Sequence, residues 1–309
     1  MSWSPYYSGV RAEPYSPQLP AAPPWRAFPR SPEDGERKIP FEPPDGLVEA
    51  VNAALCLRRP LLLTGAPGAG KSSVAESVAY ELSLGGLLRW HITSRSTLAD
   101  ALYRYDALGR LDATRHGDID DIARFLRLGP LGTALVPSDR PRALLIDEID
   151  KSDIDLPSDL LDVLERGTFE IPELARHDQK CFQIREWQGD AKHEVVEGRA
   201  LCTEFPFIAM TSNGEREFPA PFLRRCIRFT MPDPTYDILT RIVRAHLGPK
   251  AQELEDGLLQ DFAQRVKNQR NLATDQLLNA VFLVTRDVAP HSEQRKRLVD
   301  LLLRDLSSA

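Results

Sequence analysis

The sequence lacks several features that define common classes of protein. Its 309 residues contain no run of about 18 consecutive apolar residues, the length that a membrane-spanning helix needs. The start of the chain lacks the basic end and the apolar stretch of a signal peptide. The four cysteines are Cys56, Cys181, Cys202 and Cys226. They form no C-x-x-C pair, so neither a zinc site nor a disulfide framework is indicated. We therefore expect a cytoplasmic protein that has no membrane partner.

An excess of positive charge is also lacking. Lys and Arg together number 39 against 45 for Asp and Glu, which gives a formal net charge of -6. A protein that coats nucleic acid needs a basic surface, so nucleic acid is an unlikely partner, although a local basic strip stays open. No repeat of fixed period is present. The length suits one large α/β domain and a second, smaller domain.

Proline is concentrated in the first 44 residues, where it prevents a helix or a central strand. We predict that residues 1–40 form a proline-rich, disordered tail. The tail has more aromatic residues than a spacer needs, so docking onto a neighbouring surface is a second possibility. These residues are Trp3, Tyr6, Tyr7, Tyr15, Trp25 and Phe28.

The apolar residues of 41–232 alternate between helical and strand spacing. Helices are predicted at 47–55, 72–82, 97–103 and 156–165, and strands at 60–64, 87–93, 142–146, 205–211 and 227–231. The fully apolar strand at 142–146 is typical of a parallel sheet covered on both faces. The pattern predicts an α/β domain with a three-layer parallel sheet, and residues 233–309 predict a small all-helical lid domain.

A glycine-rich loop follows the first predicted strand. It reads Gly65-Ala66-Pro67-Gly68-Ala69-Gly70-Lys71-Ser72 and matches G-x-x-x-x-G-K-[ST] without a mismatch. The backbone N–H groups of such a loop and the positive end of the next helix bind phosphate. We expect Lys71 to bind the β and γ phosphates and Ser72 to bind magnesium. Ser73 is also expected to bind the nucleotide cofactor. The loop predicts a P-loop NTPase with ATP and Mg²⁺ as cofactors.

Two carboxylates, Asp147 and Glu148, directly follow the strand at 142–146. Open α/β sheets bind ligands at the carboxyl ends of their strands, so this pair is expected beside the phosphate loop. Asp147 would hold the magnesium ion, and Glu148 would polarise a water for attack on the γ phosphate. The alternative is an acidic start to the next helix, where carboxylates favour the helix dipole.

The order of these motifs resembles the AAA+ ATPases and, within them, the MoxR-like branch. The likeness covers roughly residues 40–288 and rests on the two nucleotide motifs and on the pieces at 93–97, 128–131, 144–152, 211–213 and 218–225. It implies an AAA+ core with a helical lid, ATP hydrolysis, and a homo-oligomeric ring, most often of six subunits. It further implies chaperone-like remodelling of a protein client, with a von Willebrand A type domain as one candidate.

The resemblance also assigns roles to four more residues. Asn213 would orient the attacking water, although an Asn-Gly turn is common at strand ends. Arg225, with Arg224 as the second choice, would reach the γ phosphate bound to a neighbouring subunit; a solvated surface pair is the alternative. Arg270 is the candidate lid arginine, but its surroundings lack the Ser-Pro-Arg pattern, and a solvated charge is the alternative.

Two inserts interrupt the predicted domain, near 105–140 and at 168–204. The first is expected to contain a helix at 119–128, and the resemblance implies that it faces the pore or a partner. The second shows strand-like alternation around a turn at Gln188-Gly189-Asp190, which predicts a β-hairpin. Two other functions remain open: a nucleotide-gated assembly or binding module with slow or no hydrolysis, and a nucleic-acid motor.

Overall fold

A computed structural model describes residues 21–26, 41–116, 121–249, 256–267, 272–285 and 292–304. Among them, the chain divides into two units. The larger comprises Pro43–Gly65 and Lys71–Met231. The smaller comprises the described parts of Met1–Glu42 and Pro232–Ala309, together with Ala66–Gly70. Most of the predicted tail lies outside the described residues, and the three predicted domain ranges stay predictions.

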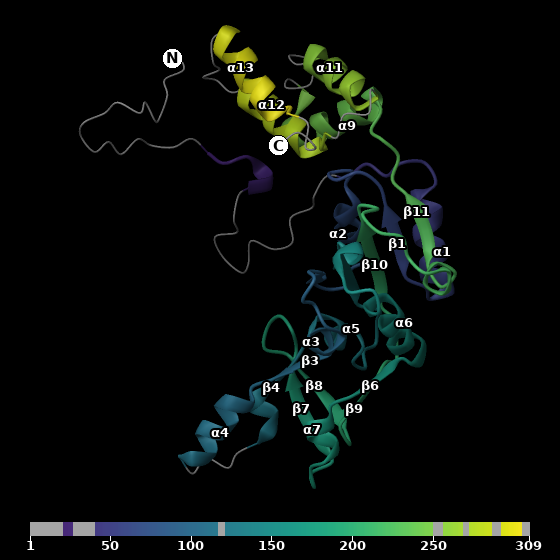
Figure 1. Cartoon of the computed structure of the whole chain (residues 1–309), viewed down its shortest axis with the longest axis vertical. Coiled ribbons are helices and arrows are strands. Elements are labelled where there is room, and N and C mark those ends of the chain that lie inside the picture. The colour runs from purple at the N-terminus through teal and green to yellow at the C-terminus, as the bar shows by residue number, and fades with distance from the viewer. Residues whose placement is uncertain are drawn as a thin grey trace, which may run out of the picture. The chain divides into compact units, whose positions relative to one another are not determined.

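The larger unit is built on a five-stranded sheet in the order β11-β1-β10-β5-β2 (Figure 1). Its strands are β1 (Leu61–Thr64), β2 (Leu88–His91), β5 (Ala143–Asp147), β10 (Phe207–Ser212) and β11 (Ile227–Thr230). All four neighbouring pairs are parallel. The central strand β10 is buried along its whole length, as expected for a sheet covered on both faces. The predicted α/β fold with a parallel sheet is confirmed.

Helices of the larger unit follow the predicted order along the chain. The predicted ones are found as α1 (Leu47–Leu57), α2 (Lys71–Glu81), α3 (Leu98–Leu102) and α6 (Leu156–Arg166), whereas the short α8 (Ala220–Leu223) was not predicted. Helix α6 buries Leu156, Leu160, Leu161 and Leu164, which recur at helical spacing and form one apolar face. It ends at Gly167, whose left-handed backbone (φ 62°) suits a glycine cap.

The two inserts together form a second sheet, in the order β3-β4-β7-β8-β9-β6. Its strands are β3 (Tyr103–Tyr105), β4 (Leu126–Leu128), β6 (Thr168–Glu170), β7 (Cys181–Arg185), β8 (Lys192–Val196) and β9 (Arg199–Leu201). Strands β7 and β8 form an antiparallel hairpin around the expected turn. Strand β4 of the first insert pairs with β7 of the second, so the inserts are parts of one layer. Figure 1 shows this sheet with α4 (Ala107–Arg115) and α7 (Pro172–Ala175) away from the central sheet.

The prediction of a helix at 119–128 is wrong for residues 121–128, the part of this range that the structure describes. Residues Ile122–Phe125 form a 3-10 turn, η2, and Leu126–Leu128 form β4, while 117–120 lie outside the described residues. The reason is the antiparallel pairing of β4 with β3, in which Leu126 and Leu128 are buried and Arg127 is exposed. A short apolar run fits both the spacing of a helix and that of a strand. Here the pairing with a strand elsewhere in the sequence determines which structure forms.

A close approach of two backbones in this unit depends on Gly132 in α5 (Pro130–Ala134). A Cβ at this position would lie 1.8 Å from the backbone oxygen of Leu102, which cannot move without displacing α3. We expect Gly132→Ala to lower the free energy of unfolding by about 3 kcal/mol, the upper range for overpacking. Urea unfolding measures it. The control is Gly257→Ala in the helix α11 (Asp256–Lys267), where a Cβ meets nothing within 4 Å and alanine should stabilise the helix by up to about 1 kcal/mol. Equal stability of the two variants would contradict the prediction.

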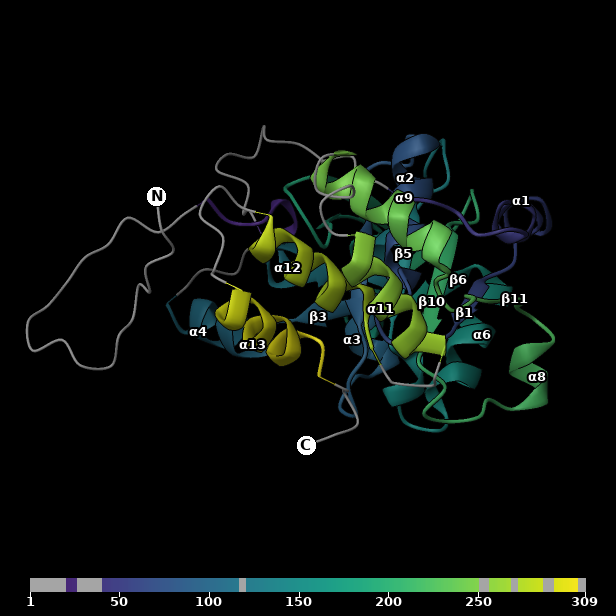
Figure 2. The ribbon, with the colours of Figure 1, turned by 90° about the horizontal axis from the view of Figure 1, so that it is seen from above.

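The smaller unit is helical in its described residues, as Figure 2 shows from above. Its helices are α9 (Tyr236–Leu247), α11 (Asp256–Lys267), α12 (Thr274–Val284) and α13 (Ser292–Leu302), with a short 3-10 turn, η1, at Pro24–Arg26. The helices share one apolar core, which includes Leu239, Val243, Leu259, Phe262, Leu277, Val281 and Leu303. Arg270 lies outside the described residues. Within the described part of the chain, no helix has both the length and the apolar character to cross a bilayer.

Candidate functional site

The register of the central sheet brings the predicted motifs to one edge. His91 at the end of β2 lies opposite Asp147 at the end of β5, and Met210 of β10 lies opposite Ile146. Thr64, the last residue of β1, lies opposite Ser212. The carboxyl ends of these strands are therefore adjacent, which is where parallel α/β sheets bind ligands.

The phosphate loop leaves β1 at this edge and leads into α2. Gly65, Gly68 and Gly70 have φ angles of 141°, 74° and 79°, a backbone region that favours glycine. A Cβ on Gly65 would also lie 3.0 Å from the backbone oxygen of Met231. The motif's glycines are thus required by the backbone path, and the path ends at the N-terminus of α2, where the positive end of the helix dipole lies.

Lys71 is the charged residue of this loop, and it is buried, with 7% of its surface exposed. Its Nζ donates to the backbone oxygen of Gly65 and to Oδ1 of Asn213, both at 2.8 Å. Burial lowers the pKa of Lys71 from its ordinary value of 10.5, while the charges of Asp150, Asp147 and Glu148 act in the opposite direction. A desolvated ammonium group is stabilised by an anion, so the surroundings of Lys71 fit a phosphate ligand.

Asp147 accepts two hydroxyl hydrogen bonds at one carboxylate oxygen. Ser72 Oγ lies 2.9 Å and Thr211 Oγ1 lies 2.6 Å from Asp147 Oδ1. A carboxylate and a hydroxyl are the oxygen ligands that Mg²⁺ accepts from the protein in P-loop enzymes. The residues present therefore fit a magnesium ion held between α2 and β5.

Glu148 has an unusual backbone and two side-chain partners. Its φ of 61° and ψ of 47° are left-handed, a conformation that costs a non-glycine residue about 1 to 3 kcal/mol and is common at functional sites. Its N–H donates to Thr211 Oγ1 at 2.9 Å. Its carboxylate accepts from Lys151 Nζ at 2.8 Å and from Asn213 Nδ2 at 3.4 Å. The bond to Glu148 raises the pKa of Lys151, so this contact is an ion pair.

Asp150 is a buried residue of the site that was not among the predicted site residues. It lies in the turn η3 (Ile149–Lys151), and its Oδ2 accepts from the backbone N–H groups of Asn213 at 2.9 Å and Glu215 at 3.1 Å. Its other oxygen, Oδ1, is buried without a hydrogen-bond partner among the described residues. Asp150 therefore fixes the backbone that carries the Asn213 side chain.

His91 and Thr211 were also absent from the predicted site. His91 Nδ1 lies 3.8 Å from Asp147 Oδ2, and its Nε2 lies 3.6 Å from Glu148 Oε2. Thr211 contacts both acidic residues through its hydroxyl. His91 is the last residue of β2 and Thr211 the penultimate residue of β10, and both strands neighbour β5. The rule that parallel strands end at one edge could therefore have found them once the strand order was known.

The two candidate arginines do not join this cluster in their recorded contacts. Arg225 pairs with Glu165 of α6 through Nε and through Nη2, the latter at 3.2 Å, and its side chain is about a third exposed at 36%. The backbone oxygen of Arg224 accepts from Arg59 Nη1 at 3.1 Å, and the Arg224 residue is exposed. The structure thus brings together Lys71, Ser72, Asp147, Glu148 and Asn213, and holds Arg225 against its own chain.

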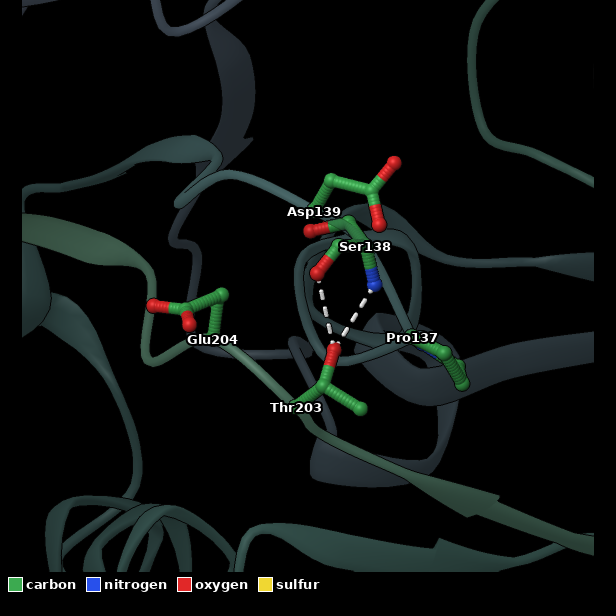
Figure 3. Close-up of a pocket in the computed structure, with 5 residues that line it drawn as sticks. All are labelled: Pro137, Ser138, Asp139, Thr203 and Glu204. Atoms are coloured by element: carbon green, nitrogen blue, oxygen red, sulfur yellow. Dashed lines mark hydrogen bonds between the residues drawn. The ribbon is translucent and has the colours of Figure 1, made fainter.

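A separate hollow is formed by two segments that precede strands of the central sheet, and Figure 3 shows the residues that line it. It is lined by Pro137, Ser138, Asp139, Thr203 and Glu204. Thr203 Oγ1 accepts from Ser138 N at 2.9 Å and donates to Ser138 O at 2.8 Å, which joins the two segments. These segments precede β5 and β10, so they lie at the amino ends of parallel strands, and the hollow is not part of the phosphate site.

Comparisons with known proteins agree with this geometry. Residues 60–226 match the model of the AAA domain, dynein-related subfamily. No curated protein matches the sequence. Similar solved structures include a RuvB variant of Thermotoga maritima, with a TM-score of 0.43 and 15% identity over 82% of this chain and 66% of that one. NtrX of Brucella abortus in complex with ATP has a TM-score of 0.47 and 12% identity over 84% of this chain and 52% of that one.

The chain thus spans less than two thirds of these two structures, and at such TM-scores and identities they support no statement about activity. The family match covers both nucleotide motifs, the strand that ends before Asn213, and Arg225. It does not single out the MoxR-like branch. Because the match covers more than half of the 309 residues, the chain belongs to the dynein-related subfamily of AAA domains.

Proposed function

We propose that this protein is an ATP-hydrolysing AAA+ enzyme of the MoxR-like branch that remodels a protein client. The observation that carries the proposal is the meeting of Lys71, Ser72, Asp147, Glu148 and Asn213 at one edge of the sheet. Each residue type matches a separate need of phosphoryl transfer: a cation, a metal ligand pair, a base and a polar group that orients water.

ATP and Mg²⁺ are the cofactors of the proposal. Lys71 would bind the β and γ phosphates, together with the backbone N–H groups of the loop from Gly65 to Ser73, except at Pro67, which has none. Ser72 and Asp147, already 2.9 Å apart, would hold the magnesium ion. When bound, that ion neutralises charge on the phosphate oxygens. Two acceptors of Lys71 Nζ are the carbonyl oxygen of Gly65 and the amide oxygen of Asn213, and a phosphate can replace either as an acceptor.

Glu148 and Asn213 would act on the attacking water. Glu148 supplies the carboxylate that would accept a proton from water, and Asn213 Nδ2 lies 3.4 Å from its Oε1. The amide of Asn213 contacts both Lys71 and Glu148, so it is suited to orient a water between the phosphate and the base. Asp150 holds this amide in position through the Asn213 backbone.

The assembly and the client belong to the same proposal. Members of the AAA+ family commonly form oligomeric rings, and we propose a homo-hexamer in which Arg225 serves the site of the neighbouring subunit. The client would be a protein, with a von Willebrand A type domain as the candidate drawn from the resemblance. A Glu148→Gln chain held in ATP would trap the client, and a client recovered equally well by a Lys71→Ala chain would contradict an ATP-driven cycle.

Replacing Lys71 tests nucleotide binding itself. The Lys71→Ala chain loses one charged donor to each of two phosphates. Hydrogen bonds to charged groups contribute about 1.5 to 3 kcal/mol each, so the two together give about 3 kcal/mol or more, and ATP should bind at least about 100-fold more weakly. Titration calorimetry with ATP and magnesium measures the dissociation constant. The matched control is Lys180→Ala, which removes an exposed lysine paired with Glu197 in the second sheet and should leave the constant unchanged. Unchanged affinity in Lys71→Ala would exclude the proposed role of the loop.

A nucleotide-gated module with slow hydrolysis is the second candidate. Two ion pairs favour it, because Lys151 holds the proposed base and Glu165 holds Arg225 in contacts that hydrolysis does not use. Steady-state phosphate release separates the two functions. Fast turnover that depends on Glu148 excludes the module, whereas tight ATP binding without turnover excludes the remodelling enzyme.

A further inference from the structure

One described piece of the N-terminal region is attached to the helices of the smaller unit. Pro24–Arg26 forms the 3-10 turn η1, which lies beside α12 in both views (Figures 1 and 2). Trp25 Nε1 donates to Oδ1 of Asn279 at 3.1 Å, across 254 positions of sequence. The indole N–H is the single polar group of that side chain, so this bond satisfies it fully.

The Trp25 ring also meets aromatic rings of two different helices. It lies edge-on to Phe282 of α12, with centroids 5.7 Å apart, and to His246 of α9, with centroids 6.1 Å apart. Edge-to-face pairs of this kind contribute beyond the area that they bury. Trp25 packs against the apolar core of the helices, while Pro24 and Arg26 on either side are exposed. The tryptophan is thus the anchor of the segment.

A second contact returns the chain to the same helix. Glu42 Oε2 lies 3.5 Å from Nε of Arg241 in α9. Arg241 and His246 are five positions apart on α9, which corresponds to about 7.5 Å along the helix axis. Two described residues of the N-terminal region, Trp25 and Glu42, therefore contact the same helix, α9, and the entropic cost of closing a chain between two such contacts grows only slowly with its length. These two contacts indicate that the segment bound to the helices belongs to the same chain.

We propose that His246, Asn279 and Phe282 form a tryptophan site on the helical unit, and that the ligand of this site is the Pro24-Trp25-Arg26 segment of the same chain. The site combines one hydrogen-bond acceptor with two ring partners, which suits an indole. An exposed surface ion pair such as Arg241 with Glu42 contributes little, so Trp25 is the contact on which attachment depends.

A labelled synthetic peptide of residues 19–30 tests the site on the full chain. A Trp25→Ala chain has an open tryptophan site and should bind the peptide, as measured by fluorescence anisotropy. Wild-type chain should bind it at least about tenfold more weakly, because the tethered segment competes at a high effective concentration. A Trp25→Phe chain keeps a ring but loses the N–H donor, so its peptide affinity should lie between the two.

Three controls connect the binding to this site. A peptide with alanine in place of Trp25 should bind neither chain, and a chain with both Trp25→Ala and Asn279→Ala should lose the peptide. A Trp3→Ala chain changes another tryptophan of the same N-terminal region and should behave as wild type. Absence of peptide binding to the Trp25→Ala chain, or equal binding to wild type, would overturn the proposal.

Dilution of the protein shows whether the segment in the tryptophan site comes from the same chain or from a second copy. Exclusion of the peptide by wild-type protein should not depend on protein concentration when the occupant is tethered in the same chain. If dilution of the wild-type protein increased peptide binding, the occupant would come from a second copy, and the same-chain assignment would be wrong.

Discussion

A Glu148→Gln chain is expected to bind ATP with unchanged affinity and to hydrolyse it about 10² to 10⁴ times more slowly than the wild type. The amide keeps the size of the side chain but cannot accept a proton from water. The bonds that Asp147 receives from Ser72 and Thr211 do not involve the Glu148 side chain, so the proposed magnesium ligands stay in place. Calorimetry measures the affinity, and phosphate release measures turnover.

The control for this variant is Glu81→Gln, which makes the same chemical change on an exposed residue at the end of α2. It should leave both quantities unchanged. If Glu148→Gln hydrolysed ATP at the wild-type rate, the base would have to be another group. If it lost ATP binding instead, Glu148 would be part of the nucleotide contacts, and the division of roles between the two carboxylates would be wrong.

Strands and helices with strong periodic patterns were predictable from the sequence to within about two residues. Strand 227–231 became β11 (Ile227–Thr230), and helix 156–165 became α6 (Leu156–Arg166). Helix α6 has one apolar face and ends at a glycine, and β11 alternates apolar and polar residues before a proline-containing segment, so local and tertiary preferences agree. The three-residue strands β3 and β4 were not predicted because they exist through pairing with each other, which no local window contains.

The site was predictable where a motif fixes its own geometry and unpredictable where it depends on strand order. The phosphate loop and the pair Asp147 and Glu148 are contiguous in sequence, so their chemistry could be inferred. His91 lies beside Asp147 only because β2 is the neighbour of β5 in the sheet, and the sequences of these two strands do not indicate that they are neighbours. Asp150 could be read as a helix-start acid, and only its bonds to the backbone of Asn213 and Glu215 reveal a positioning role.

The Arg225→Ala chain is expected to lose about 10³ to 10⁵ in turnover, or roughly 4 to 7 kcal/mol of transition-state stabilisation, if Arg225 acts on a neighbouring site. In this structure the guanidinium pairs with Glu165 of its own chain, and both side chains are partly exposed. An exposed ion pair contributes at most about 1 kcal/mol, so exchange of Glu165 for a phosphate costs little compared with the expected gain. The control is Arg166→Ala, which removes an arginine paired with Asp162 on the surface of α6.

Mixing two inactive chains tests whether Arg225 acts between subunits. In a head-to-tail ring, a site is complete when one chain supplies Glu148 and its neighbour supplies Arg225. An equal mixture of Arg225→Ala and Glu148→Gln chains should therefore restore about a quarter of the sites, because half of the chains keep Glu148 and half of their neighbours keep Arg225. An Arg224→Ala chain keeps Arg225, so it should hydrolyse ATP without a second variant if Arg225 is the residue that crosses the interface. Loss of turnover in Arg224→Ala that the Glu148→Gln chain restores would identify Arg224 instead. If each single chain is inactive and the mixture also stays inactive, Arg225 serves the site of its own chain, and a ring is not needed for hydrolysis.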